Sequence, residues 1–203
     1  MFFHLLFGFF GAILSGLAFG PINLSVVSIT ISKDLKAGIR FSAAAAFVET
    51  FHAWMAILFG KLFLDSINTS VTFQTFVVIF FLGVGTYFLL KKDHFKIEKE
   101  SKKKSSDFFK GFALALLNPQ AIPGWLFMIA VLNSHGWLEW NHFNLITFLI
   151  GAAVGKYLIL GIYGYFSHSI RDKIDHLCGT INKSIGILLI MIGIYQIIRF
   201  SIL

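Results

Sequence analysis

The sequence predicts an all-α membrane protein whose six transmembrane helices form two inverted repeats of three helices each. Three observations support this fold: an apolar composition, Lys and Arg gathered in alternate connections, and a proline break in the first apolar segment of each half. Of the 203 residues, 57% are hydrophobic and 13% are charged, whereas soluble domains are about 25% charged. The six apolar segments cover residues 2–31, 39–62, 73–90, 108–132, 145–166 and 184–200.

The first apolar segment is longer than one straight span requires. Residues 1–32 contain no Lys, Arg, Asp or Glu, and as a helix they would measure roughly 48 Å against a hydrocarbon core of ~30 Å. The excess leaves room for a bend at Gly20-Pro21. A signal peptide is the competing interpretation, but the basic start and the small-residue cleavage site are missing, so we expect a membrane span.

Lys and Arg are distributed asymmetrically between the apolar segments. All but three of the 17 basic residues lie at the first, third and fifth connections, and the exceptions are Lys61, Lys156 and Arg199. Basic residues mark the cytoplasmic side of a membrane protein. We therefore expect a multi-pass protein of the cell (inner) membrane, with both termini extracytoplasmic and the connection 91–107 cytoplasmic.

The connection 91–107, KKDHFKIEKESKKKSSD, is strongly polar. It separates repeat one (1–90) from repeat two (108–203) within a single membrane domain, and it is either a solvated linker or a site for anionic lipid headgroups. Three spans per half place the two halves in opposite orientations, as in inverted-repeat transporters. Because the net charge of +7 lies mainly in these connections, it does not predict nucleic-acid binding.

The second apolar segments of the two halves align with each other. Setting FSAAAAFVET against FLIGAAVGKY pairs Phe41 with Phe148 and Glu49 with Lys156. The match is short, but it coincides with proline breaks at the start of both halves. Together these signals predict an internal repeat.

Small and aromatic residues predict packing rather than chemistry. Gly151 and Gly155 have the spacing of a small-residue motif, which lets two membrane helices approach closely. Trp125, Trp137 and Trp140 suit positions at the membrane–water interfaces. We assign no functional role to these five residues.

Three ionisable side chains lie inside the predicted spans and away from the span ends: Glu49, His52 and Lys156. A charge near the bilayer centre costs at least about 2.5–3.5 kcal/mol on insertion scales, so such groups face a cavity or a partner. Glu49 and Lys156 form either a structural ion pair between the halves or a site for substrate or protons, and the two roles are compatible. His52 shares a helix face with Glu49 and is either a hydrogen-bonded interior residue or a proton relay.

The proline breaks predict a receptor for a carboxylate. Proline is favoured at the first position of a helix and Asn118 has the chemistry of an N-cap, so half-helices are expected to begin at Pro21 and Pro119. In inverted halves both N-termini would point at the bilayer centre, each with about half a positive charge and free N–H groups. With Glu49 attracting an amino group, this is a site for a zwitterion. The alternative is that both prolines are packing kinks.

These stretches resemble the LysE/RhtB family of amino-acid exporters. GPINLSVVSITISKDLKAGIRFSAAAAFVET is similar to the family's Gly-Pro-x-Asn segment and second helix, GFALALLNPQAIPGW to its Asn-Pro segment, and INKSIGILLIMIGIYQIIR to its last helix. The resemblance implies proton-driven export of amino acids or similar small zwitterionic solutes by a homodimer in the lipid bilayer. It also implies which residues line the transport site: Gly20, Pro21, Asn23, Glu49, Asn118 and Pro119.

Other functions are disfavoured by what the predicted spans lack. A thiol–disulfide carrier needs paired cysteines, and Cys178 is the only cysteine. A membrane hydrolase needs a nucleophile beside a base, and no motif supports one. Export of a divalent metal or another ion is the closest rival, with Glu49, His52 and Asn23 as ligands, but the spans offer no second acidic residue. We expect a transporter, not an enzyme, without cofactor or bound metal.

Overall fold

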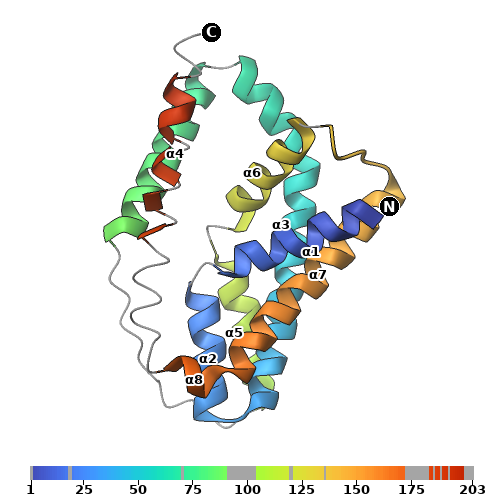
Figure 1. Cartoon of the computed structure of the whole chain (residues 1–203), viewed down its shortest axis with the longest axis vertical. Helices are drawn as coiled ribbons and strands as arrows, with labels where there is room; N and C mark the ends of the chain where they lie inside the picture. The colour runs from blue at the N-terminus through green and yellow to red at the C-terminus, as the bar shows by residue number, and fades with distance from the viewer. Residues whose placement is uncertain are drawn as a thin grey trace. The chain divides into compact units, whose positions relative to one another are not determined.

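A computed structural model describes residues 2–17, 20–69, 71–90, 104–118, 121–134 and 136–171, and residues 183–198 except 185, 188 and 192. The regular secondary structure of these residues is entirely helical, as the sequence predicts. The helices are α1 (Phe2–Leu17), α2 (Pro21–Ser32), α3 (Leu35–Thr69), α4 (Val71–Leu90), α5 (Lys104–Leu116), α6 (Ala121–Ser134), α7 (His142–Tyr165) and α8 (Ser167–Arg171) (Figure 1).

Two described helical segments, Leu35–Gly60 and His142–Tyr165, are long and apolar enough to cross a membrane. Two further spans arise if each bent helix pair counts as one, which gives up to four candidate spans. The linker predicted at 91–107 lies mostly outside the described residues. At its end α5 already begins at Lys104, so the last residues of the predicted linker are helical.

The chain divides into two compact units. The first contains Met1–Gly60 and Phe95–Lys173, and it holds every described residue of the predicted site. The second contains Lys61–His94 and Ile174–Leu203. Within the second unit α4 approaches the C-terminal helical residues closely, because a Cβ built on Gly85 would lie 3.0 Å from the carbonyl oxygen of Gly186.

The bend predicted at Gly20-Pro21 is present. Helix α1 ends at Leu17, and α2 begins at Pro21 after a bend of 75°. Gly20 precedes α2 with an extended backbone, and its carbonyl accepts a hydrogen bond from the Leu24 N–H at 3.1 Å. Proline tolerates the first helical position because its missing N–H would have no intrahelical acceptor there. The sequence therefore starts a new helix at this point instead of continuing the first.

A second bend of 59° separates Asp107–Leu116 from Ala121–Asn133. The carbonyl of Asn118 accepts a hydrogen bond from the Ala121 N–H at 3.4 Å. Pro119, where we predicted the start of the half-helix, lies outside the described residues. The described part of α6 begins at Ala121.

Helix α1 lies along α7, and glycines bring the two backbones together (Figure 1). A Cβ built on Gly151 would overlap the carbonyl oxygen of Leu5, and one on Gly155 would overlap the carbonyl oxygen of Phe9. A Cβ on Gly8 of α1 would in turn overlap a carbonyl oxygen of α7. The predicted close-packing role of Gly151 and Gly155 is confirmed.

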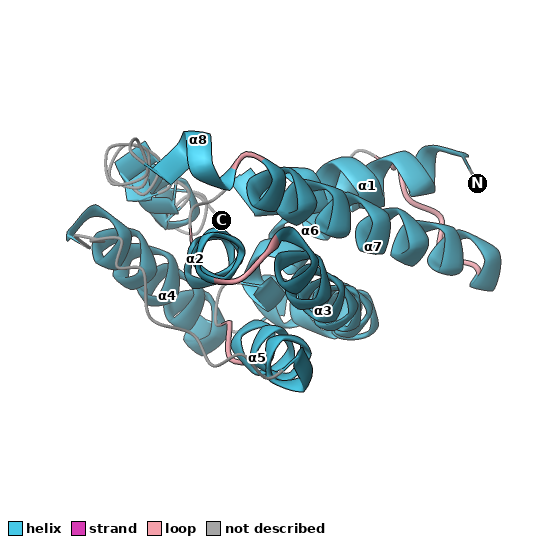
Figure 2. Cartoon of the chain, turned by 90° about the horizontal axis from the view of Figure 1, so that it is seen from below, coloured by secondary structure: helices cyan, strands magenta, loops and turns pink. Residues whose placement is uncertain are grey.

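The same kind of contact recurs between α5 and α3, which lie side by side with α2 when seen end-on (Figure 2). A Cβ built on Gly111 of α5 would overlap the carbonyl oxygen of Phe41 in α3. On α7 the carbonyl that faces Gly8 belongs to Phe148, the residue that aligns with Phe41. The carbonyl of each aligned phenylalanine thus faces a glycine from the other half of the chain.

The starts of α3 and α7 also match. The Asp34 side chain accepts a hydrogen bond from the Ala37 N–H at 2.6 Å, and the Asn141 side chain accepts one from the Asn144 N–H at 2.8 Å. Both are side-chain caps, which satisfy an N–H that has no acceptor in the first turn. The register that aligns Phe41 with Phe148 also aligns these two caps.

The tryptophans differ in their burial. Trp125 is only 2% exposed and packs in the core beside Ala12 and Ile129, with its ring 5.7 Å from that of Phe148. Its place under α1 follows from the glycine surface of that helix, which leaves room for a large ring. Trp137, in contrast, is 54% exposed.

Candidate functional site

Glu49 lies on α3, fully enclosed, and meets a cation from α7. One carboxylate oxygen, Oε1, accepts a hydrogen bond from Ser15 Oγ at 3.1 Å and lies 3.4 Å from Lys156 Nζ. The other oxygen, Oε2, is buried and has no hydrogen-bond partner among the described residues. Glu49 and Lys156 are 1% and 3% exposed. The structure thus joins the two residues that the sequence alignment paired.

Small residues on α1 and α7 make this meeting possible. Gly155, next to Lys156, lets the backbone of α1 approach α7 at Phe9, and Gly16 receives the side chain of Ile159. This packing holds the last turn of α1 against the lysine. A larger residue at either glycine would push the helices apart and separate the groups.

Ser15 belongs to the site, although the sequence analysis did not select it. Its hydroxyl accepts a hydrogen bond from Lys156 Nζ at 3.3 Å. The hydroxyl has a single hydrogen, which it can donate to Glu49 Oε1 or to the Ala12 carbonyl at 3.0 Å. The available signal was its position, a hydroxyl group near the end of a largely apolar helix, about one turn before the break.

Asn23 connects the two sides of the first break. Its side-chain Nδ2 donates to the carbonyl of Gly16 at 2.6 Å, and the residue is 3% exposed. The carbonyls at the end of α1 lack intrahelical donors because the helix stops there. Asn23 therefore ties the first turn of α2 to the turn of α1 that carries Ser15.

The remaining predicted site residues lie at the breaks or on α3. Gly20 and Pro21 form the start of α2, and Asn118 lies at the second break. His52 is 4% exposed, one helical turn from Glu49, and its Nδ1 has no hydrogen-bond partner in the described part of the chain. Pro119 falls outside the described residues.

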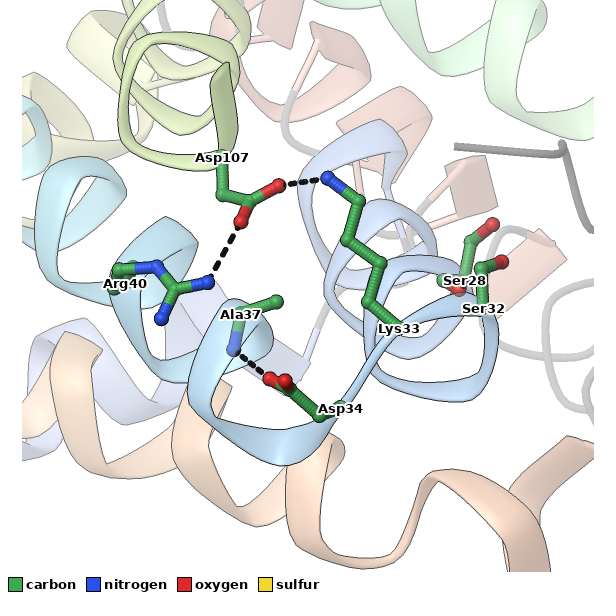
Figure 3. Close-up of polar contacts among 7 residues, drawn as sticks. All are labelled: Ser28, Ser32, Lys33, Asp34, Ala37, Arg40 and Asp107. Carbon is green, nitrogen blue, oxygen red and sulfur yellow. Dashed lines mark hydrogen bonds and ion pairs between the residues drawn. The ribbon is translucent and has the colours of Figure 1, made fainter. Parts of the chain in front are cut away.

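A second group of charges links the ends of α2, α3 and α5. Asp107 is 1% exposed and forms ion pairs with Lys33 and Arg40, the latter at 2.9 Å (Figure 3). Asp34 lies beside them and caps α3 through the Ala37 N–H (Figure 3). These ion pairs tie the last residue of the predicted linker 91–107 to the end of α2 and the start of α3, which was not predicted from the sequence.

A cleft of about 550 Å³ lies at the start of α1. It contains none of the predicted site residues, and its lining is formed by Phe3, His4, Phe7, Gly136, Trp137 and Glu139. Among the described residues no group of three or more His, Cys, Asp or Glu side chains could hold a metal ion. The candidate site is therefore the buried ion pair between Glu49 and Lys156, bridged by the hydroxyl group of Ser15.

Apolar helices of span length, two bent helix pairs and a buried ion pair indicate a membrane transport protein. The chain belongs to the LysE type translocator family, whose family model matches residues 13–199. The match confirms the resemblance found in the sequence. Because the members of this family are membrane transporters, the protein is a membrane transporter of small solutes. Comparisons with curated proteins and with solved structures found no match.

Proposed function

We propose that the protein exports amino acids or similar small zwitterionic solutes across the cell (inner) membrane, driven by the proton gradient. The observation that carries the proposal is the buried Glu49, which has one oxygen paired with Lys156 and Ser15 and the other without a described partner. A carboxylate in this state can accept an ammonium group or a proton. Both are needed for a solute–proton exchange.

The breaks supply the complementary half of the proposed site. The start of α2 at Gly20-Pro21 presents N–H groups that lack intrahelical acceptors, and a helix N-terminus favours a carboxylate. We assign the same role to Asn118-Pro119 at the second break. Asn23 holds the first break in place through Gly16.

We further propose that six spans form two inverted repeats, 1–90 and 108–203, around a cytoplasmic linker at 91–107. Two pairs of matching contacts support this arrangement: the glycines that face Phe41 and Phe148, and the side-chain caps at the starts of α3 and α7. In the proposed topology both termini are extracytoplasmic, and two copies form a homodimer. A reporter fused after Leu203 should read as extracytoplasmic and one within 91–107 as cytoplasmic; reversed readings would contradict the orientation.

The experiment that tests the proposed function is a solute screen in vesicles. Full-length protein is reconstituted, a pH gradient is imposed, and uptake of labelled amino acids is measured with the gradient and after its collapse. We expect gradient-dependent transport of at least one amino acid, absent from a Glu49→Gln variant. Transport of divalent cations instead, or amino-acid transport that does not respond to the gradient or to Glu49→Gln, would contradict the proposal.

A further inference from the structure

The ion pair gives the buried site no net charge. In the described part of the chain, the buried side chains that carry a full charge are Glu49, Asp107 and Lys156. Asp107 is already paired with Lys33 and Arg40 at the ends of α2, α3 and α5. Lys156 therefore balances the negative charge of Glu49. Among the described residues, no other buried carboxylate lies at this ion pair.

Both charged groups have bonding capacity that their described contacts do not use, which a zwitterion reaching the site could fill. Lys156 Nζ has three hydrogens; its described hydrogen bond goes to Ser15 and its ion pair to Glu49 Oε1. Glu49 Oε2 is enclosed and has no hydrogen-bond partner among the described residues, so this acceptor is unused. The ammonium group of a solute can pair with Oε2 and its carboxylate with Nζ, which turns one ion pair into an alternating set of four charges with no net charge added.

We propose that Lys156 sets the charge selectivity of this site, so that the protein carries zwitterions of zero net charge and rejects solutes with an additional positive charge. The inference rests on the proposed function, because it specifies the solute class of the same site. With a solute that has a second ammonium group, the site would hold three positive groups, which are Lys156 and the two ammonium groups. Only two carboxylates, that of Glu49 and that of the solute, would balance them. Contacts between like charges in a desolvated site cost free energy, so they lower the affinity for the cationic solute.

The first test compares matched solutes on the unaltered protein. Ornithine carries an ammonium group where norleucine has its terminal methyl group, and 2,4-diaminobutyrate carries one where homoserine has its hydroxyl group, so each pair changes the charge at nearly constant size. In reconstituted vesicles we expect the neutral member of at least one pair to be transported roughly tenfold or more faster than its cationic counterpart. Equal transport within the pairs, or preference for the cationic members, would overturn the inference.

The second test changes the lysine. Lys156→Met removes the charge at similar length and should reduce the preference for the neutral member by roughly tenfold or more, whereas Lys156→Arg should keep it. Lys36→Met, at an exposed position, is the matched control and should behave like the unaltered protein. A folded Lys156→Met protein with unchanged preference, or a Lys156→Arg protein that has lost it, would overturn the inference.

The outcomes separate this inference from the proposed function. If the vesicles transport no amino acid at all, the proposed function fails, and the inference fails with it. If amino acids are transported without regard to their net charge, the proposed function stands and only the role of Lys156 fails. If Lys156→Met does not fold, the inference is still tested by the transport of neutral and cationic solutes by the unaltered protein and by Lys156→Arg.

Discussion

Lys156 Nζ lies 3.4 Å from Glu49 Oε1, and Ser15 bridges the two groups, while Glu49 Oε2 has no hydrogen-bond partner among the described residues. An ion pair that served packing alone would gain from satisfying every lone pair, because desolvating two charges is costly. This pair is satisfied on one side and open on the other. The arrangement matches a group that still has a ligand to bind.

Neutralising both members of the pair separates a structural role from a transport role. Glu49→Gln or Lys156→Met alone leaves a buried charge without its partner, and we expect a loss of about 3–5 kcal/mol in the free energy of unfolding. The double variant should regain most of that stability and still fail to transport. Thermal melting and vesicle uptake on the same preparation measure both effects. Full transport by the double variant would mean that the pair is only structural.

Straightening the first break tests whether it forms part of the site. Replacing Gly20 with Ala and Pro21 with Leu restores a backbone donor and removes the ring clash, which favours a continuous helix by about 3 kcal/mol for the proline and about 1 kcal/mol for the glycine. We expect a protein that melts no lower than the unaltered one but no longer transports. Pro123→Ala, in the first turn of α6, is the control that should still transport. Lost stability with partial transport would indicate a packing kink.

Two glycines of α7 provide a matched test of the packing between α1 and α7. A Cβ on Gly151 would overlap the carbonyl oxygen of Leu5, whereas a Cβ on Gly161 would meet nothing within 4 Å. Gly151→Ala should therefore lower the stability by about 1–3 kcal/mol. Gly161→Ala should raise it by up to about 1 kcal/mol through helix propensity. Equal melting temperatures for the two variants would contradict the close contact.

The ion pairs of Asp107 should contribute to stability rather than to solute binding. Asp107→Asn removes the anion between Lys33 and Arg40, and we expect a loss of about 1–3 kcal/mol. That is less than a fully buried pair would cost, because the Arg40 side chain is 33% exposed and screened by solvent. Asp34→Asn is the control: Asn caps a helix as well as Asp, so its stability should change by less than about 0.5 kcal/mol. A thermally unaffected Asp107→Asn protein would contradict this role.

The sequence predicted the features that depend on local chemistry. A break at Gly20-Pro21 follows from the backbone properties of two adjacent residues, and the close packing of α7 follows from the spacing of Gly151 and Gly155. The meeting of Glu49 with Lys156 was one of the roles expected from the sequence, where an alignment set the two residues opposite each other.

The features that depend on the packing of distant segments were missed. Ser15 is an ordinary helix residue until α3 and α7 place a carboxylate and an ammonium group beside it. Asp107 ends a charged stretch that looks solvated, and its burial depends on Lys33 and Arg40, which are far away in the sequence. The burial of Trp125 could not be predicted from its residue type, because it depends on small residues of α1 that leave space for its ring.

The contact between α1 and α7 constrains the order in which the protein is built. Residues 2–17 are synthesised first, but the backbone that covers their glycines belongs to residues 142–165. Ribosomes add roughly 5–20 residues per second, so α1 waits on the order of ten seconds in the bilayer before its neighbour exists. The contact between α1 and α7 can thus form only after most residues of the first unit have been synthesised.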